Sequence, residues 1–163
     1  MSRAVLSLGS NVGDRTAHLQ TAVRTLGRTV RAVSSIYRTP PWGGVEQRDF
    51  FNIVVIAEDD GVDPHAWWRR CQALEQEAGR ERTVRWGPRT LDADVILVEV
   101  HGDAVVSDDP ELTLPHPRAA ERAFVLKPWV EVDPGAQLPG AGPIADLLDD
   151  LDTSGITRVG HVH

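Results

Sequence analysis

The sequence predicts an α+β fold of the ferredoxin-like kind, a β-α-β-β-α-β sandwich with helices on one face of an antiparallel sheet. Two observations carry this prediction. Apolar β-branched runs and amphipathic helix patterns follow one another in that order, and residues typical of helix ends flank the helix patterns. Because 163 residues is the size of one compact domain, we expect a single domain over residues 1–163, with C-terminal additions to the sandwich.

The first half of the chain supplies three strands and one helix. Residues 4–8 form a short apolar run that ends at the turn-forming GSNVGD. Residues 14–27 predict an amphipathic helix that ends at Gly27, because apolar residues recur three and four positions apart: Leu19, Ala22, Val23 and Leu26. Residues 30–38 and 50–58 are rich in β-branched and aromatic residues, which predicts two further strands.

The second helix is predicted over residues 63–79. Asp63 is a suitable N-cap, Pro64 fits the first helical position, and Gly79 follows the last turn. Residues 95–100, VILVEV, predict the fourth strand, and the stretch IADLLDDL near the C-terminus predicts a last amphipathic helix.

Composition excludes several classes of protein. The hydrophobic content of 41% and charged content of 25% are ordinary for a soluble globular protein. No apolar run approaches the roughly 20 residues of a membrane span, and the N-terminus has no signal-peptide pattern. Cys71 is the only cysteine, which excludes an internal disulfide and makes a cytoplasmic location the expectation.

The distribution of charge indicates a small anionic ligand. The net charge of −7 disfavours general binding to nucleic acid, and Lys127 is the only lysine. Within ten residues that contain one acid, the chain has four arginines: Arg80, Arg82, Arg85 and Arg89. Arginine-for-lysine drift would raise the arginine content everywhere, but it would not produce this cluster.

Asp92 and Asp94 follow the arginine cluster directly. Side chains two apart on a strand point to the same face, with Cα atoms roughly 6.5 Å apart. Mg²⁺ prefers oxygen ligands and is commonly held by one or two carboxylates together with phosphate oxygens. Beside the arginines, the pair indicates a polyphosphate site, whereas the plainer alternative is a solvated strand end. Because there is no Walker loop, arginines must neutralise any bound ATP.

These motifs together resemble the 6-hydroxymethyl-7,8-dihydropterin pyrophosphokinases of folate biosynthesis. The matching stretches run in order from about residue 5 to 129: LSLGSNVGDR, SSIYRTPPWG, DFFNIVV, LEQEAGRER, RWGPRTLDADVILV and LTLPHPRAAERAFVLKPW. The resemblance implies transfer of a pyrophosphoryl group from ATP to the hydroxymethyl oxygen of the dihydropterin, with AMP as the other product. It also implies the ferredoxin-like fold, two Mg²⁺ ions and small-molecule substrates. We expect a monomer that has neither nucleic acid nor a membrane as partner.

The same resemblance assigns the phosphate side of the site. Asp92 and Asp94 are expected to hold both metal ions, while Arg82 and Arg89 act on the phosphates during catalysis. The ATP-binding set comprises Glu75, Arg80, Arg82, Trp86, Arg89, Thr113, His116 and Arg122. Trp86 belongs to a loop that the resemblance implies closes over the ligands and excludes water.

The pterin side follows in the same way. Phe50 and Phe124 match the two rings between which the family stacks the pterin. Asn52 matches the side chain that reads the polar edge of the ring. Thr39 and Pro40, with the region of Trp42, are expected to supply main-chain contacts.

Three other functions stay open from the sequence. A nucleotidyl- or phosphotransferase acting on another hydroxymethyl heterocycle would share the aspartates and arginines. An RNA-binding module could use the same fold, although the acidic charge and the aspartate pair argue against it. An inactive regulatory domain would not need the intact metal and arginine sets.

Overall fold

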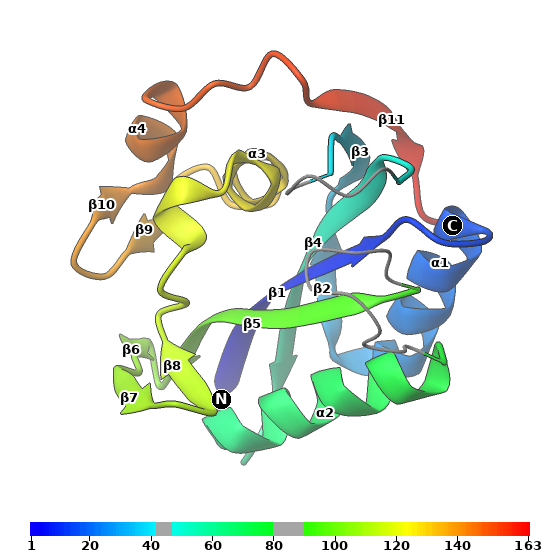
Figure 1. The fold of residues 1–163 in the computed structure, drawn as a ribbon. Coiled ribbons are helices and arrows are strands. Elements are labelled where there is room, and N and C mark those ends of the chain that lie inside the picture. Colours follow the sequence, from blue (N-terminus) through cyan, green and yellow to red (C-terminus); the bar gives the residue numbers. More distant parts are fainter. Residues whose placement is uncertain (42–46, 80–89) are drawn as a thin grey trace.

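The computed structural model describes residues 1–41, 47–79 and 90–163, and Figure 1 shows its fold. In this part of the chain, a seven-stranded sheet has the order β11-β3-β4-β1-β5-β6, and β2 pairs with β4. The strands of this sheet are β1 (Ser2–Ser10), β2 (Val30–Val33), β3 (Ser35–Thr39), β4 (Phe50–Asp59), β5 (Asp92–Val100), β6 (Asp103–Ala104) and β11 (Thr157–His161). The α-helices are α1 (Arg15–Leu26), α2 (Pro64–Glu77), α3 (Ala123–Val132) and α4 (Ile144–Asp149).

The predicted order of elements is confirmed. Strand β1 lies between β4 and β5 and is antiparallel to both, and β2 and β3 lie on the other side of β4. The predicted strand over 30–38 is two strands, because the chain breaks at Ser34. There the Ser34 hydroxyl accepts a bond from the N–H of Val54 at 2.9 Å. The fourth strand begins at Asp92 instead of residue 95, so both aspartates lie inside it.

Both of the first two helices have an aspartate N-cap, of which Asp63 was predicted and Asp14 is seen only in the structure. Asp14 accepts a hydrogen bond from the N–H of Ala17 at 3.0 Å, and Asp63 accepts one from the N–H of Ala66 at 2.7 Å. These bonds satisfy amide groups that lack a partner inside the helix. At the other end of α1, Gly27 has a φ of +58°, which favours glycine.

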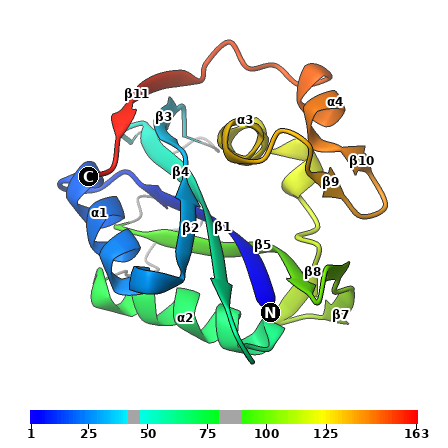
Figure 2. The ribbon, with the colours of Figure 1, turned by 180° about the vertical axis from the view of Figure 1, so that it is seen from behind.

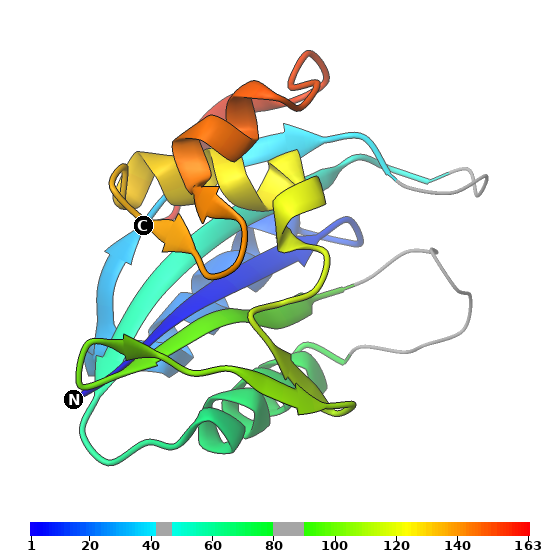
Figure 3. The same ribbon diagram turned by 90° about the vertical axis from the view of Figure 1, so that its left-hand side faces the viewer.

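Helices cover both faces of the sheet, as Figures 2 and 3 show. On one face, β-strand residues such as Leu6 and Val55 pack with α1 and α2 around the buried Trp67. On the other face, Val54 and Ile96 pack beneath α3 and α4. Adjacent residues of β4 are therefore buried on opposite faces, which explains its unbroken apolar run.

Helix α3 is the main element that the sequence patterns did not predict. Its segment, AFVLKPWVEV, contains Pro128, which removes one backbone donor and disfavours a helix interior. Burial of Leu126 and Trp129 against the sheet nevertheless holds the segment in a helix. The predicted last helix is α4, which is shorter than expected and ends at Asp149.

The remaining elements are short. Two 3₁₀ turns lie at η1 (Gly27–Thr29) and η2 (Ala119–Glu121), and two small hairpins pair β7 (Ser107–Asp109) with β8 (Leu112–Leu114) and β9 (Gln137–Leu138) with β10 (Gly142–Pro143). Among the described residues, no helix has the length and apolar character that crossing a membrane requires.

Candidate active site

Two predicted groups of residues meet where β1 ends and β4 and β5 begin. In the strand registers, Gly9 of β1 lies opposite Asn52 of β4 on one side and opposite Asp92 of β5 on the other. Asp94 lies opposite Ser7. We call this region the Gly9 end of the sheet. Because neighbouring strands are about 4.8 Å apart, only the width of one strand separates the two groups.

The two aspartates lie on the sheet face that α3 covers. Ala93 and Val95, which alternate with them, are buried in the core with α1 and α2. Ile96 belongs to the core beneath α3. Because side chains alternate along a strand, Asp92 and Asp94 share the face of Ile96, as the Asp-x-Asp spacing predicted.

Arg122 connects the aspartates to the aromatic side of the site. Its Nη1 lies 3.9 Å from Oδ2 of Asp94, and its guanidinium carbon is 5.5 Å from the centroid of the Phe124 ring. Arg122 is the residue immediately before α3. The beginning of this helix therefore brings a cation and an aromatic ring to the aspartates.

A cavity of about 260 Å³ lies along β5 on its outer side. Five of the predicted site residues line it together: Glu75, Asp92, Asp94, Thr113 and His116. The rest of its wall comes from α2, β5 and the segment that contains β8, including Trp68, Gln72 and Leu112. The structure thus gathers residues that are dispersed along the sequence into one polar cavity beside the aspartate pair.

Glu75 is fixed to the strand that carries the aspartates. It is 6% exposed, and its Oε2 accepts a hydrogen bond from the N–H of Ala93 at 2.9 Å. This N–H lies between Asp92 and Asp94 in the chain. Glu75 therefore holds the aspartate strand against α2, besides lining the cavity.

His116 is placed in the cavity wall by its own backbone, whose N–H donates to the carbonyl oxygen of Ile96 at 2.8 Å. Burial, together with the positive charges of Arg122 and Arg118, lowers the pKa of His116 to about 4. The ring is therefore neutral at pH 7. It can exchange hydrogen bonds with a ligand, but it adds no charge to the site.

On the other side of Gly9, the Asn52 side chain is held in place. It is 4% exposed, and its Nδ2 donates to Oγ1 of Thr39 at 2.7 Å. Thr39 pairs with Phe50, so these three predicted pterin residues belong to one strand pair. A Cβ atom at Gly9 would lie 2.4 Å from Oδ1 of Asn52, which means that the amide crosses directly over the glycine.

Several predicted site residues lie outside the described residues: Arg80, Arg82, Trp86, Arg89 and Trp42. Their roles stay predictions. Pro40 lies at the edge of the described part, where its ring would be 3.2 Å from a Cβ atom at Gly155. The C-terminal segment therefore packs against the start of the predicted pterin loop.

The donor set at Asp92 and Asp94 fits Mg²⁺. Both are carboxylates on one strand face, and the Asp94 side chain is 43% exposed, which leaves room for water and phosphate oxygens around an ion. They also line the polar cavity in which a triphosphate could complete the ligand set.

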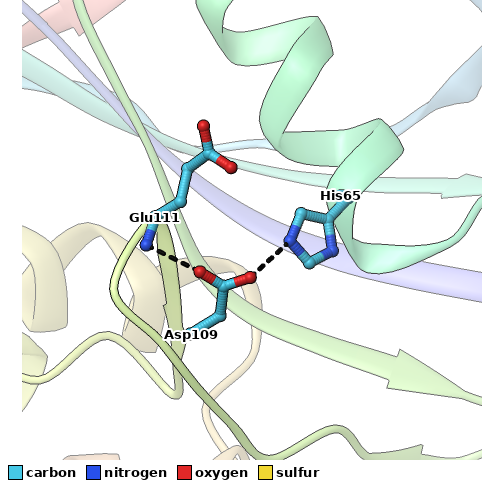
Figure 4. Close-up of side chains that lie close together, drawn as sticks. All are labelled: His65, Asp109 and Glu111. Atoms are coloured by element: carbon cyan, nitrogen blue, oxygen red, sulfur yellow. Dashed lines mark hydrogen bonds and ion pairs between the residues drawn. The ribbon is translucent and has the colours of Figure 1, made fainter.

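A different set of possible metal ligands lies at the wall of the cavity, whose lining includes Glu111. Figure 4 shows His65, Asp109 and Glu111, each with a ligand atom within 4.8 Å of the others. Both Asp109 oxygens already have partners: Oδ2 is 3.1 Å from Nε2 of His65, and Oδ1 accepts from the N–H of Glu111 at 2.9 Å. These bonds attach the β7–β8 turn to the first turn of α2. We therefore interpret this cluster as a structural contact that stabilises the cavity wall.

Comparison with known proteins identifies the family of the chain. The family described as 7,8-dihydro-6-hydroxymethylpterin-pyrophosphokinase (HPPK) matches residues 5–134. A Mycobacterium tuberculosis protein named 2-amino-4-hydroxy-6-hydroxymethyldihydropteridine pyrophosphokinase is 49% identical over 165 residues, covering 93% of this chain and 85% of that protein. The chain belongs to the HPPK family.

Two further relatives agree with the HPPK assignment. A Mycobacterium leprae protein of the same name is 54% identical over 148 residues, covering 87% of this chain and 78% of that protein. A crystal structure described as HPPK-DHPS in complex with substrates has a TM-score of 0.68 at 12% identity, covering 91% of this chain and 43% of that one. This second likeness concerns the fold, which it confirms, and the present chain spans less than half of that solved chain.

The HPPK resemblance seen in the motifs is thus confirmed, but one residue of the site was missed. Gly9 lies inside the matching stretch LSLGSNVGDR, yet its role was not predicted. A glycine near the end of an apolar strand is a known sign of close approach by another group. That sign could have drawn attention to Gly9, but the identity of Asn52 as its neighbour required the strand register.

Proposed function

We propose that this HPPK-family protein transfers pyrophosphate from ATP to the hydroxymethyl oxygen of 6-hydroxymethyl-7,8-dihydropterin in folate biosynthesis. The observation that carries the proposal is the meeting of two half-sites at Gly9. The aspartate pair and polar cavity lie on one side of this residue, and Asn52 with Phe50 lies on the other. A transfer between two bound substrates requires this proximity.

In the proposed reaction, a bond forms between the hydroxymethyl oxygen and the β-phosphorus. The bond from that phosphorus to the oxygen it shares with the α-phosphate breaks, AMP leaves with that oxygen, and the hydroxyl proton passes to water. Phosphoryl-type transfer needs little covalent help from a protein. It depends on alignment of the reacting atoms and on stabilisation of negative charge.

The phosphate side supplies the charge stabilisation. Asp92 and Asp94 would hold two Mg²⁺ ions, which when bound supply positive charge to the triphosphate and to the attacking oxygen. Arg122 would donate to phosphate oxygens from the beginning of α3, and Arg82 and Arg89 would do so from the segment outside the described residues. Neutral His116 and Thr113 would contribute hydrogen bonds from the cavity wall.

The pterin side supplies the alignment. Phe50 and Phe124 would stack on the two faces of the flat ring, and Asn52 would bond to its polar edge. Because Thr39 already holds the Asn52 amide, little side-chain freedom is lost when the pterin binds. Thr39, Pro40 and the Trp42 region would complete this wall with main-chain groups.

We extend the proposal to the setting of the reaction. The enzyme would act in the cytoplasm and would be a monomer. Because both substrates are small soluble molecules, it would need neither nucleic acid nor a membrane as partner. The single domain over residues 1–163 would hold the complete site.

The proposal is tested by identifying the products formed from ATP, Mg²⁺ and the hydroxymethyl dihydropterin. We expect AMP and the pterin diphosphate in equal amounts by chromatography and mass spectrometry. Asp94→Asn should lower turnover by several orders of magnitude, since it removes charge that holds the metal. ADP with a pterin monophosphate would instead indicate a phosphotransferase and would refute the proposal.

A further inference from the structure

A carboxylate at the end of α3 links the two walls of the predicted pterin site. Glu131 accepts a hydrogen bond from the Tyr37 hydroxyl at 2.6 Å through Oε1. Its Oε2 accepts bonds from the N–H and the hydroxyl of Ser35, at 2.9 and 3.1 Å. Three donors of β3 therefore converge on one side chain of α3.

The spacing along both elements connects Glu131 to the site. Glu131 follows Phe124 by seven residues, so the two lie on nearly the same side of α3, about 10 Å apart along its axis. Tyr37 precedes Thr39 by two residues, so these two share a strand face. The bond between Tyr37 and Glu131 thus fixes the distance between the wall that carries Thr39 and the wall that carries Phe124.

The first turn of α3 needs this external support. Pro128 has no N–H to donate to the carbonyl of Phe124, four residues earlier, so one bond between the first and second halves of the helix is missing. The position of Phe124 therefore depends more on how α3 is attached to the sheet than it would in an uninterrupted helix.

The charge states of Tyr37 and Glu131 favour a strong hydrogen bond between β3 and α3. Partial burial opposes ionisation of Glu131, but the bonds from Tyr37 and Ser35 and the positive charge of Arg158 hold the pKa of its carboxyl below the usual value. Burial, followed by the bond to Glu131 and its negative charge, raises the pKa of Tyr37 to about 12. At neutral pH the pair is a protonated phenol donating to a carboxylate, a charge-assisted bond.

The C-terminal strand completes the same network. β11 pairs with β3, placing Arg158 opposite Tyr37 and His161 opposite Ser35. Nδ1 of His161 lies 3.4 Å from Oγ of Ser35, and Nε2 lies 3.0 Å from Nη2 of Arg158. A segment without sequence motifs therefore supports the strand that leads into the pterin wall.

We propose that Glu131 is a positioning residue, which sets the separation of the β3 and α3 walls and thereby the affinity for the pterin. It does not touch the reacting atoms. The inference rests on the proposed function for the identity of the ligand, but the contacts that carry it are independent of that function.

The kinetic test compares Glu131→Ala, Glu131→Gln and Tyr37→Phe with the wild type. We expect Glu131→Ala to raise KM for the pterin at least tenfold, with KM for ATP changed less than twofold. Tyr37→Phe, which keeps both Ser35 bonds, should have a smaller effect of the same kind, and Glu131→Gln should lie between wild type and Glu131→Ala. The matched control is Asp103→Asn, an exposed carboxylate on β6 at the opposite end of β5, which should change neither constant.

Amide hydrogen exchange of the free protein gives a readout independent of catalysis. In Glu131→Ala, we expect exchange at residues 37–39 and 124–126 to become at least tenfold faster, while residues 4–8 change only as much as global stability requires. A uniform change would indicate a general stability effect and overturn the inference. Faster exchange at both walls with an unchanged pterin KM would also overturn it. Failure of the wild type to form AMP would contradict the proposed function instead.

Discussion

Gly9 leaves the space that the Asn52 side chain occupies. A Cβ atom at this residue would lie 2.4 Å from Oδ1 of Asn52, closer than nonbonded atoms can approach. The glycine is therefore required by the position of Asn52 in the proposed pterin wall, since the Gly9 backbone lies between the strand of Asp92 and the strand of Asn52.

Gly9→Ala should displace the Asn52 amide. We expect KM for the pterin to rise at least tenfold and the free energy of unfolding to fall by about 1–3 kcal/mol, as for other overpacked sites. The measurements are steady-state kinetics and urea denaturation. Gly135→Ala is the matched control, because a Cβ atom there meets nothing within 4 Å. If Gly9→Ala changed the pterin KM and the free energy of unfolding as little as Gly135→Ala, the close contact between Gly9 and Asn52 would be contradicted.

For single residues, the sequence predicted the shared strand face of the two aspartates, but it did not predict the role of Gly9. The side-chain period of a strand is local, so Asp92 and Asp94 could be assigned to one face from their spacing alone. The contact between Gly9 and Asn52 depends on the pairing of β1 with β4, which no local pattern specifies. The hydrogen bonds that Glu131 of α3 accepts from β3 could not be predicted for the same reason.

Among the elements, helices α1 and α2 were predictable and α3 was not. Asp14 and Asp63 are local N-cap signals, and both are used as caps in the structure. In α3, Pro128 masks the helix pattern, and burial of Trp129 against the sheet outweighs it. Tertiary packing thus determines the element that carries Arg122 and Phe124 to the site.

The segment between β8 and α3 should make stability depend on pH through His116. Its pKa is about 4 in the folded protein and about 6.5 in an unfolded chain. Between these values the unfolded state binds more protons than the folded state, so the free energy of unfolding falls as pH drops from 6.5 to 4. Below pH 4 both states are protonated, and this contribution no longer changes.

We measure the free energy of unfolding by urea denaturation at pH 7, 5.5 and 4. Between pH 7 and pH 4, this free energy should fall by roughly 1–3 kcal/mol less in His116→Gln than in the wild type. His163→Gln, at the exposed C-terminal residue, is the matched control and should follow the wild type. An identical pH profile for His116→Gln and wild type would show that the His116 ring is not shielded as described.

At the scale of the whole molecule, the two faces of the sheet have different roles. The face with α1 and α2 is a continuous apolar core, and the opposite face divides into a core beneath α3 and α4 and a polar region at the Gly9 end. The order of elements along the chain was enough to predict the sandwich. The second helical layer was not predictable, because its anchoring contacts come from residues far apart in the sequence.

The central claim is that the aspartate pair and the pterin wall form one site at Gly9. It is tested most directly by replacing Mg²⁺ with paramagnetic Mn²⁺, together with an α,β-methylene analogue of ATP that cannot react. We predict strong broadening of the hydroxymethyl proton resonances of the bound pterin, and its loss in Asp94→Asn. Pterin that binds with no broadening in the wild type would contradict the claim, because the metal and the pterin would then occupy separate places.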